Sequence, residues 1–315
     1  MKRIAVLGAI VVSGLTAVGV TAQGLPGIEG IEHVAGKVYK IAGAGGNTVV
    51  FERANDVVLI DTKLPNSGEA IMTEVRKITD KPLAMIINTH SHPDHMGSNN
   101  ELSGDGIEVI AHVNSEKRME AEGGPFGASN VDRSFSSHMK IGEGADEIDL
   151  YYFGAGHTDG DAFVAFPAAR TVMAGDIYAW HMSPLIDPGS GGSMLALPTS
   201  VTAAYYTIPN VDYWIQGHGG VSTSSEFLSF VTFNRALVQI AEQTVQSGGT
   251  EREALDRLAA NPSFAIFLGT ETLPGLEYGG SPKSRALINL MVAFQELRGE
   301  EPQLIMGLPR EEWPE

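Results

Sequence analysis

The sequence predicts a layered α/β fold with a helical C-terminal extension, and two observations support this prediction. Up to about residue 220, short apolar runs typical of buried strands alternate with helical segments, and several runs are followed by His or Asp. From residue 223 onward the pattern is helical and contains no His. Because α/β proteins build their sites at the carboxyl ends of strands, the first part of the chain is expected to carry the functional site.

The first 22 residues have the layout of a secretory signal peptide. Lys2 and Arg3 precede an apolar run over residues 4–20, and a cleavage site is expected after Ala22. An uncleaved membrane anchor is the alternative. The chain has no Cys, which excludes a lipid anchor on that residue. We therefore expect a periplasmic or secreted protein with no stable membrane span after signal cleavage.

Composition narrows the chemistry and the partners. Without Cys there are no disulfides, no thiolate nucleophile and no Cys ligands, so any transition metal must be held by nitrogen and oxygen atoms. The formal net charge of −17 repels phosphate backbones, so nucleic acid is not an expected partner. A small-molecule substrate is the expected partner.

The predicted domain over residues 23–222 begins with paired strands. Residues 47–53 are rich in Val and Phe, residues 54–56 (Ala-Asn-Asp) favour a turn, and residues 57–60 return as a second strand. Asp61 follows directly and ends this strand.

A helix over residues 67–79 is predicted next, because Ile71, Val75 and Ile78 are spaced four and three residues apart. The remaining elements are apolar runs or helical patterns bounded by turn residues. We expect strands at 83–88, 107–111, 148–153, 162–166, 171–174 and 213–216, and helices at 115–121 and 195–207. The strands 83–88, 148–153, 171–174 and 213–216 each lead into His or Asp.

Residues 223–315 form the predicted helical extension. A Thr-x-x-Glu sequence, typical of a capping box, begins at Thr223 and again at Thr250, each time before a helical stretch. Residues 284–298 form a third predicted helix. The extension is expected to act as a cap or as the surface through which a homodimer forms.

The segment from His90 to His95 is the strongest functional signal in the chain, with three imidazoles and one carboxylate in six residues. Residues two apart at a strand end point the same way, so His90 and His92 can hold one metal ion. Pro93 disfavours a helix at the residue before it, and the turn frees Asp94 and His95 for a second ion. The segment therefore predicts a metal site.

Two other interpretations of these polar segments are less favourable. Surface loop histidines without a ligand would not be expected to gather directly after a buried strand. A phosphate-binding loop at residues 43–46 (Gly-Ala-Gly-Gly) lacks the following Lys-Ser/Thr and leads into a strand rather than a helix.

With three further positions, the chain resembles the metallo-β-lactamase superfamily, whose motif is His-x-His-x-Asp-His followed by a separate His, an Asp and a final His. All seven positions occur in order between about residues 38 and 220. They are His90, His92, Asp94 and His95, then His157 in Gly-His-Thr, Asp176 in Ala-Gly-Asp and His218 in Gly-His-Gly.

The resemblance implies a four-layer αββα sandwich with two divalent metal ions at one edge of its sheets. The first ion would bind His90, His92 and His157. The second would bind Asp94, His95 and His218, with Asp176 bridging the two. Zn²⁺ fits the nitrogen and oxygen ligands best, while Fe and Mn are also compatible.

Asp176 also bears on the branch of the superfamily. True lactamases have a hydroxyl or thiol there, so Asp176 resembles the glyoxalase II, lactonase and broad hydrolase branches. The implied activity is a hydrolase in which a metal-bridging hydroxide attacks the carbonyl of a lactone, ester, thioester or β-lactam-like cyclic amide. Asp94 and Asp176 are the expected catalytic carboxylates, with Asp94 passing a proton to the leaving group.

Several further residues are expected to support this site or line its pocket. Asp61 resembles the family's supporting carboxylate, with Asp159 and Asp161 as lesser candidates, although Asp161 also suits a turn cap. His112 is either close to the site or a satisfied structural His. The loop after Asp176 is expected to wall the pocket with Tyr178, Trp180 and His181, and residues 184–192 to form a mobile lid.

Two other classes of function remain open. A mononuclear iron oxygenase of the sulfur dioxygenase kind would use only two His and one carboxylate, and the complete second ligand set disfavours it. A non-catalytic protein that delivers or senses metal is disfavoured by the bridging Asp and the open, Gly-rich surroundings.

Overall fold

The computed structural model describes residues 27–104, 106–121, 131–180, 182–270 and 281–303. The expected signal peptide, residues 1–22, and His181 lie outside these ranges. Within them, no helix combines the length and the apolar character needed to cross a membrane.

The N-terminal half of the described chain forms a mixed seven-stranded sheet, called sheet A here. Strands β1 to β4 pair antiparallel, and β4 to β7 pair parallel, so β4, β5 and β6 present their carboxyl ends at one edge. In spatial order its strands are β1 (Glu32–Ala35), β2 (Val38–Ile41), β3 (Thr48–Glu52), β4 (Val57–Ile60), β5 (Leu83–Ile87), β6 (Glu108–His112) and β7 (Arg133–Phe135).

The following part of the described chain forms a six-stranded sheet, called sheet B. Its strands β11 and β12 are parallel neighbours, and the other pairs are antiparallel. In spatial order its strands are β13 (Val221–Thr223), β12 (Tyr213–Ile215), β11 (Thr171–Met173), β10 (Phe163–Phe166), β9 (Ile148–Tyr151) and β8 (His138–Ile141).

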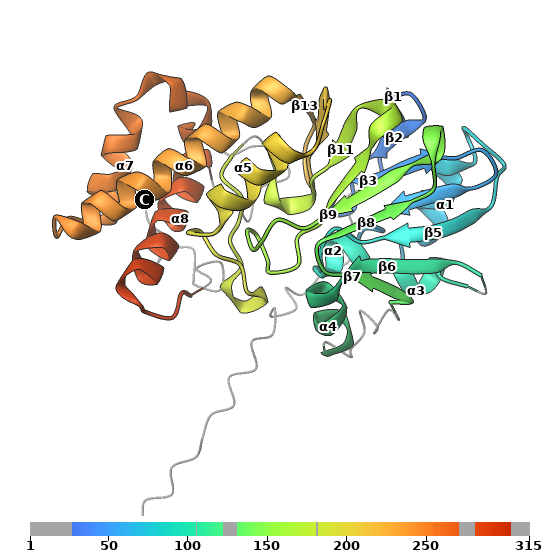
Figure 1. Ribbon diagram of the computed structural model, residues 1–315, viewed down its shortest axis with the longest axis horizontal. Coiled ribbons are helices and arrows are strands. Elements are labelled where there is room, and N and C mark those ends of the chain that lie inside the picture. The colour runs from blue at the N-terminus through green and yellow to red at the C-terminus, as the bar shows by residue number, and fades with distance from the viewer. Residues whose placement is uncertain (1–26, 105, 122–130, 181, 271–280, 304–315) are drawn as a thin grey trace, which may run out of the picture.

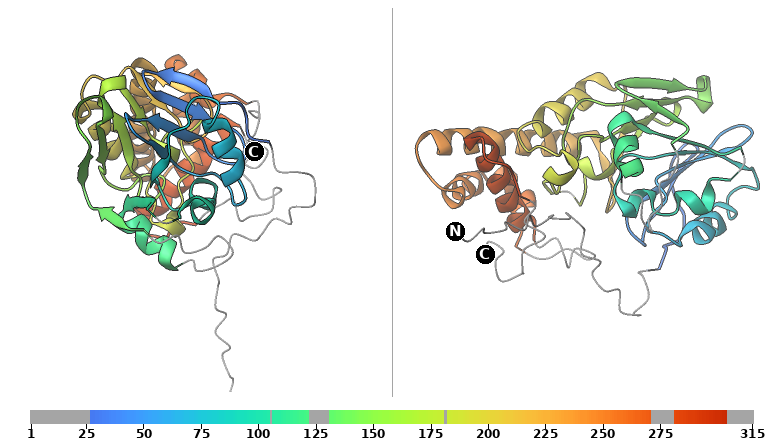
Figure 2. Two further views of the ribbon diagram at one scale, coloured as in Figure 1. Left: turned by 90° about the vertical axis from the view of Figure 1, so that its right-hand side faces the viewer. Right: turned by 90° about the horizontal axis from the view of Figure 1, so that it is seen from below.

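The two sheets pack face to face with helices on both outer faces, as the three views of the ribbon show (Figures 1 and 2). Val58, Ile60 and Ile87 of sheet A meet Val164 and Met173 of sheet B in a fully buried cluster between the sheets. Alternate residues of the same strands face outward, because successive side chains of a strand point to opposite faces. The αββα sandwich expected from the family resemblance is therefore confirmed.

The outer face of sheet A is covered by α1 (Gly68–Val75) and α3 (Asn99–Leu102). Ile71 and Val75 of α1 pack there against Leu59 and Ile86. The outer face of sheet B is covered by α5 (Leu197–Thr207) and α6 (Ser224–Gln246). Two more helices, α2 (Pro93–Met96) and α4 (Val113–Ala121), follow β5 and β6.

The C-terminal helices α6, α7 (Glu251–Ala259) and α8 (Pro282–Arg298) gather beside the sheets on the flank that lies away from α1 and β5 (Figure 1). Both Thr-x-x-Glu sequences form capping boxes. The hydroxyl of Thr223 or Thr250 accepts from the amide of the Glu three residues later, and the side chain of that Glu accepts from the amide of the Thr. The apolar faces of the helices join the outer cluster of sheet B through Phe227, Leu255 and Leu290.

Candidate metal centre

The turn after β5 carries four of the expected ligands. Strand β5 ends at Ile87, His90 follows in a bend, and His92 has extended backbone directly before Pro93 begins the short helix α2. A proline at the first helical position fits because its missing N–H needs no partner there. Asp94 and His95 therefore sit on the first turn of α2, displaced from the two preceding histidines.

The other three expected ligands come from sheet B. His157 lies in the loop after β9, Asp176 follows β11, and His218 follows β12. These strand ends meet the end of β5 at the edge shared by the two sheets. The structure thus brings all seven residues together in three overlapping groups.

The first group consists of His90, His92 and His157. Nε2 of His157 lies 3.3 Å from Nε2 of His90 and 2.9 Å from Nδ1 of His92. A four-coordinate zinc ion with ordinary Zn–N distances has ligand atoms about 3.3 Å apart. The three nitrogens therefore converge at a spacing that suits one metal ion.

The second group consists of Asp94, His95 and His218. Nε2 of His218 lies 3.0 Å from Oδ2 of Asp94 and 3.3 Å from Nε2 of His95, and the remaining pair is separated by 3.6 Å. Two nitrogens and one carboxylate oxygen at these distances form a second set of donors suited to a divalent ion.

Asp176 lies between the two groups. Its Oδ1 is 3.2 Å from Nε2 of His95, while its Oδ2 is 3.4 Å from Nε2 of His218 and 3.9 Å from Nε2 of His157. Among the described residues, the buried Oδ1 has no hydrogen-bond partner. A buried carboxylate oxygen left without a donor is costly, so this atom is consistent with a cation that the side chain would bind.

The outer nitrogens of four histidines have hydrogen-bond partners that fix their tautomers. Nδ1 of His95 faces Asp61, Nδ1 of His157 faces the carbonyl of Leu185, and Nε2 of His92 faces Asp187. Nδ1 of His90 faces the hydroxyl of Thr89, which itself donates to Asp61. When these histidines are neutral, each inner nitrogen has its lone pair directed at the centre, which is the arrangement that metal ligation requires.

Asp61 supports the centre from beneath. It is fully buried, accepts from Nδ1 of His95 at 2.8 Å and accepts from both the amide and the hydroxyl of Thr89. Its backbone is left-handed with φ of 62°, a conformation that Asp tolerates better than most residues. The structure places Asp61 where the sequence prediction put it.

Asp187 is a supporting carboxylate that the sequence analysis missed. Its Oδ2 lies 2.9 Å from Nε2 of His92, and its amide donates to the carbonyl of His157. It follows no strand and belongs to no spacing pattern, so its sequence context resembles that of an ordinary turn residue before Pro188.

The same bonds correct the expectation of a mobile lid at residues 184–192. Asp187 binds His92 and His157, Ser190 accepts from the amide of Asp159, and Gly189 accepts from Arg118. The loop is thus tied into the site by backbone and side-chain contacts. It is a wall of the metal centre rather than a gate.

The pKa values of His157, in the first ligand group, and of His218, in the second, are shifted in opposite directions. Burial lowers the pKa of His157 to about 4, with the neighbouring His92 adding to the shift. Burial opposes protonation of His218 too, but Asp176 and Asp94 outweigh it and raise the pKa of His218 to about 9. Binding an ion at the second group would therefore release protons, because ligating histidines are neutral.

One side of the centre is open. The side chain of Asp94 is 30% exposed and that of His218 is 14% exposed, whereas His90, His95 and His157 are buried. The ring of Trp180 stacks on the ring of His218 with centroids 4.2 Å apart, and the backbone amide of Trp180 donates to the carbonyl of His218. Trp180 therefore lies beside the open side, as expected of a pocket residue.

Two other candidates lie elsewhere. Tyr178 is buried in the cluster outside sheet B, where its ring packs on Phe227 and Phe230, so the expectation that it walls the pocket is wrong. His112 stacks on Tyr152, faces the carbonyl of Ser136 with Nε2 and accepts from the amide of Asn114. These bonds satisfy both ring nitrogens, so His112 has the structural role that was one of its two interpretations.

The two lesser carboxylate candidates have other partners. Asp159 forms a two-pronged ion pair with Arg118. Asp161 accepts from the amide and hydroxyl of Thr158 and so caps the turn after His157.

Two glycines form part of the floor of the centre because no side chain fits there. A Cβ at Gly46 would lie 2.2 Å from the ring of His95, and one at Gly217 would lie 2.0 Å from Oδ1 of Asp176. Lys63 holds the Gly46 segment from below, since its Nζ donates to the carbonyls of Ile41 and Gly46 at 2.8 Å each. Burial lowers the pKa of Lys63 to about 7.

The fold and the convergent His/Asp groups define the class as a metal-binding protein of the metallo-β-lactamase fold. Comparison with known families agrees, because residues 42–179 match the model of the metallo-beta-lactamase superfamily. This part of the chain is therefore a domain of that superfamily, as the sequence motif predicted.

Two similar proteins match about half of this chain. The chain is 27% identical over 177 residues to a metallo-beta-lactamase type 2 of Elizabethkingia meningoseptica, covering 55% of this chain and 68% of that protein. It is 26% identical over 148 residues to the 2,4-dinitroanisole O-demethylase subunit alpha of a Nocardioides species, covering 46% of this chain and 45% of that protein.

Solved structures agree on the fold. The DIM-1 metallo-beta-lactamase has a TM-score of 0.59 at 16% identity and covers 67% of this chain and 99% of its own. A sec-alkyl sulfatase has a TM-score of 0.64 at 16% identity and covers 85% of this chain and 50% of its own. Since 85% exceeds the share of residues 1–222, the second likeness extends into the helical extension.

Proposed function

We propose that this protein is a dinuclear metal-dependent hydrolase that acts on a carbonyl substrate. The observation that carries the proposal is the position of Asp176. One of its carboxylate oxygens lies near the second ligand group and the other faces both groups, and Oδ1 has no hydrogen-bond donor among the described residues. A carboxylate so placed suits two ions better than one.

His90, His92 and His157 would hold one divalent ion, and Asp94, His95 and His218 the other, with Asp176 shared. Zn²⁺ suits this donor set best, and Fe and Mn are the alternatives. When bound, such a pair of ions supplies a hydroxide at neutral pH and polarises the carbonyl that it attacks.

The residues of the chain position the substrate and move a proton. Asp94 is the most exposed of the carboxylates at the centre and lies 3.0 Å from His218, on the open side where a leaving group would depart. We assign it the transfer of a proton to that group. The ring of Trp180, stacked on His218, offers an apolar surface for the part of the substrate that does not react.

The proposed substrates are lactones, esters, thioesters and cyclic amides. Metal analysis of the purified protein, combined with turnover of a panel of these substrates, tests the proposal. The panel should also include a sec-alkyl sulfate and 2,4-dinitroanisole, the compounds named for two of the similar proteins. Two equivalents of metal and metal-dependent hydrolysis of a carbonyl substrate are the expected result.

Other outcomes separate the rival functions. One equivalent of iron with consumption of O₂ would identify a mononuclear oxygenase. Metal binding without turnover of any panel member would identify a protein that delivers or senses metal. Either result would refute the hydrolase proposal.

We further propose export and cleavage after Ala22, on the basis of the charged start and apolar run of residues 1–22. Determining the N-terminal residue of the protein recovered from cell fractions tests this. Recovery of Gln23 as the first residue outside the cytoplasm supports export, and an intact Met1 in the membrane fraction supports an uncleaved anchor. A homodimer through the C-terminal helices stays a prediction, which light scattering can check.

A further inference from the structure

The first ligand group depends on a short stretch of loop, residues 183–187. The carbonyl of Leu185 accepts from Nδ1 of His157, and the carboxylate of Asp187 lies 2.9 Å from Nε2 of His92. Two of the three histidines of this group therefore take their ring orientation from one loop. The outer nitrogen of the third, His90, faces Thr89 instead.

This loop is held in turn by the helical extension. On α8, the side-chain amide of Asn289 donates to the hydroxyl of Ser183 at 2.6 Å and to the carbonyl of Pro184 at 2.7 Å. Ser183 passes the contact on by donating to Asn234 of α6 at 2.7 Å. The side-chain amide of Asn289 thus donates to both of the residues that precede Leu185.

These contacts are polar, although they lie in apolar surroundings. Asn289, Ser183 and Asn234 are all fully buried, next to an apolar cluster that includes Phe230, Leu290 and Val292. Burying three polar side chains costs free energy, and more so because Oδ1 of Asn289 has no hydrogen-bond partner among the described residues, so apolar residues would pack there at lower cost. The hydrogen bonds among Asn234, Ser183 and Asn289 fix the position of the backbone at Pro184.

We propose that Asn289 is a positioning residue for the first metal ion, so that the helical extension completes the metal centre. The proposal rests on the proposed metal-binding function. The chain of contacts runs from Asn289 through Ser183 and Pro184 to Leu185 and Asp187, and from there to His157 and His92. The extension is thereby part of the site, although it contributes no ligand and contains no His.

The effect is selective for one ion. Within the second ligand group, His95 is supported from sheet A, because it is held by Asp61 and its carbonyl accepts from the amide of Thr62, while the carbonyl of His218 accepts from the amide of Trp180. None of these contacts passes through residues 183–187. Loss of Asn289 therefore weakens the first ion and leaves the second in place.

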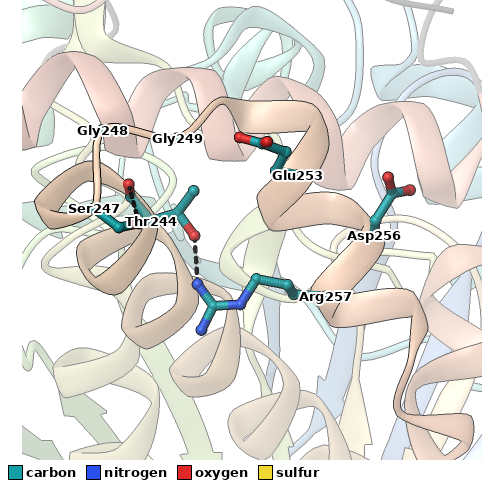
Figure 3. Close-up of a pocket in the computed structure, with 7 residues that line it drawn as sticks. All are labelled: Thr244, Ser247, Gly248, Gly249, Glu253, Asp256 and Arg257. Carbon is teal, nitrogen blue, oxygen red and sulfur yellow. Dashed lines mark hydrogen bonds between the residues drawn. The ribbon is translucent and has the colours of Figure 1, made fainter.

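The test compares Asn289→Leu with a matched variant in the same extension. Arg257 joins α7 to α6 by donating to Thr244 and lies in a surface hollow of about 520 Å³ whose lining residues all belong to the extension (Figure 3). Arg257→Gln disturbs the extension without touching the loop. Each purified full-length protein is dialysed against a graded series of chelator concentrations, and the retained metal is counted.

We expect Asn289→Leu to lose one of two equivalents at about ten-fold lower chelator concentration than the parent, at the lower end of the range for residues that orient a ligand. The Arg257→Gln variant should retain both equivalents as the parent does. Equal retention in all three proteins, or loss of both equivalents together in Asn289→Leu, would overturn the proposal.

A spectroscopic signature identifies which ion is lost. In the Co²⁺-loaded protein, the paramagnetically shifted N–H signals of His92 and His157 should move or broaden in Asn289→Leu, while that of His95 stays. If Asn289→Leu fails to fold, Ser183→Ala removes one link and leaves the bond to Pro184. The Ser183→Ala variant should shift the His157 signal by less than the loss of both bonds of Asn289 would. An unchanged His157 signal contradicts the proposal.

The two proposals fail in different ways. A parent protein that binds metal but hydrolyses no substrate refutes the hydrolase and leaves the metal-retention comparison intact. A parent that is an active dinuclear hydrolase, with Asn289→Leu unchanged in metal retention and spectrum, refutes the positioning role alone.

Discussion

Asp61 and His95 form a fully buried pair in which Nδ1 of the imidazole lies 2.8 Å from the carboxylate. The same carboxylate binds the amide and hydroxyl of Thr89, next to His90. One side chain therefore sets the ring orientation of His95 directly and that of His90 through Thr89. Asp61 links the supports of the two ligand groups.

Replacing Asp61 with Asn should weaken metal binding by about 10- to 100-fold, the usual effect of removing a partner that orients a ligand. Asn is the suitable change because it tolerates the left-handed backbone that Asp61 adopts. Titration of the metal-free protein with Zn²⁺ against a competing chelator measures the effect. Asp159→Asn, which breaks a carboxylate pair with Arg118 instead, should bind metal as the parent does.

Asp176→Ala should abolish the shared carboxylate and remove at least one metal equivalent. Because activity is proposed to need both ions, kcat/KM should fall by at least about 100-fold, the scale on which electrostatic stabilisation acts. Elemental analysis and turnover of the best panel substrate measure both quantities. Full activity in a variant that has lost both metals would contradict the proposed chemistry.

Asp94→Asn separates a ligand from a proton donor. If Asp94 protonates the leaving group, kcat should fall by about 100-fold or more beyond the change in metal occupancy, as loss of a general acid does. Substrates with poor leaving groups should suffer most, and those whose leaving group needs no proton should suffer least. Activity that falls only in proportion to metal content would argue against the proton role.

The lowered pKa of Lys63 predicts that the free energy of unfolding depends on pH. Its pKa drops from an ordinary 10.5 to about 7 through burial, so between these pH values the unfolded chain binds a proton that the folded chain does not. The unfolding free energy should therefore rise with pH above 7, by at most about 1.4 kcal/mol per unit from this group. Below pH 7 both states carry the proton and the contribution is constant.

Denaturant unfolding of the parent and of Lys63→Met at several pH values between 7 and about 9.5 isolates this group, because the variant lacks it. That range ends before tyrosines ionise in the unfolded chain, which matters because burial raises the pKa of Tyr178 well above its usual value. Parallel slopes for the two proteins would show that Lys63 keeps its proton in the folded state.

Removal of metal should loosen the contact between the two sheets. Each ligand group takes residues from the turn after β5 of sheet A and from a loop of sheet B, so a bound ion ties the sheets together. A ligand that binds only the folded state stabilises it. The apo protein should therefore melt more than about 5 °C below the Zn²⁺-loaded protein. Readdition of Zn²⁺ should restore the melting temperature.

The sequence predicted the inner strands of both sheets except β2, and it missed all four edge strands. Strands β3 to β6 and β9 to β12 are apolar runs because they are buried on both faces or nearly so. The edge strands β1, β7, β8 and β13 are short and alternate with exposed polar residues, so no apolar run marks them. An edge strand is defined by its neighbour more than by its own composition.

In the candidate site, too, the residues that belong to a local sequence pattern were predicted and the others were missed. The seven His and Asp residues lie in the turns and loops that follow apolar strands, at spacings that a motif describes, and the structure brings them together. Asp187 and Asn289 lie outside any pattern, because a hydrogen bond between distant segments has no local signature in the sequence. Tyr178 was misplaced for a related reason, since position after Asp176 does not reveal which way a ring turns.

If the protein is the proposed hydrolase, the glycines beneath the centre restrict how it can acquire a new substrate. Gly46 and Gly217 leave no room for even a methyl group against His95 and Asp176, so the floor of the cavity cannot be reshaped without displacing a ligand. Trp180, in contrast, lies beside the open side and contributes no ligand. Variation that redirects specificity must therefore enter at the rim, and a library aimed at positions beneath the metals would return inactive protein.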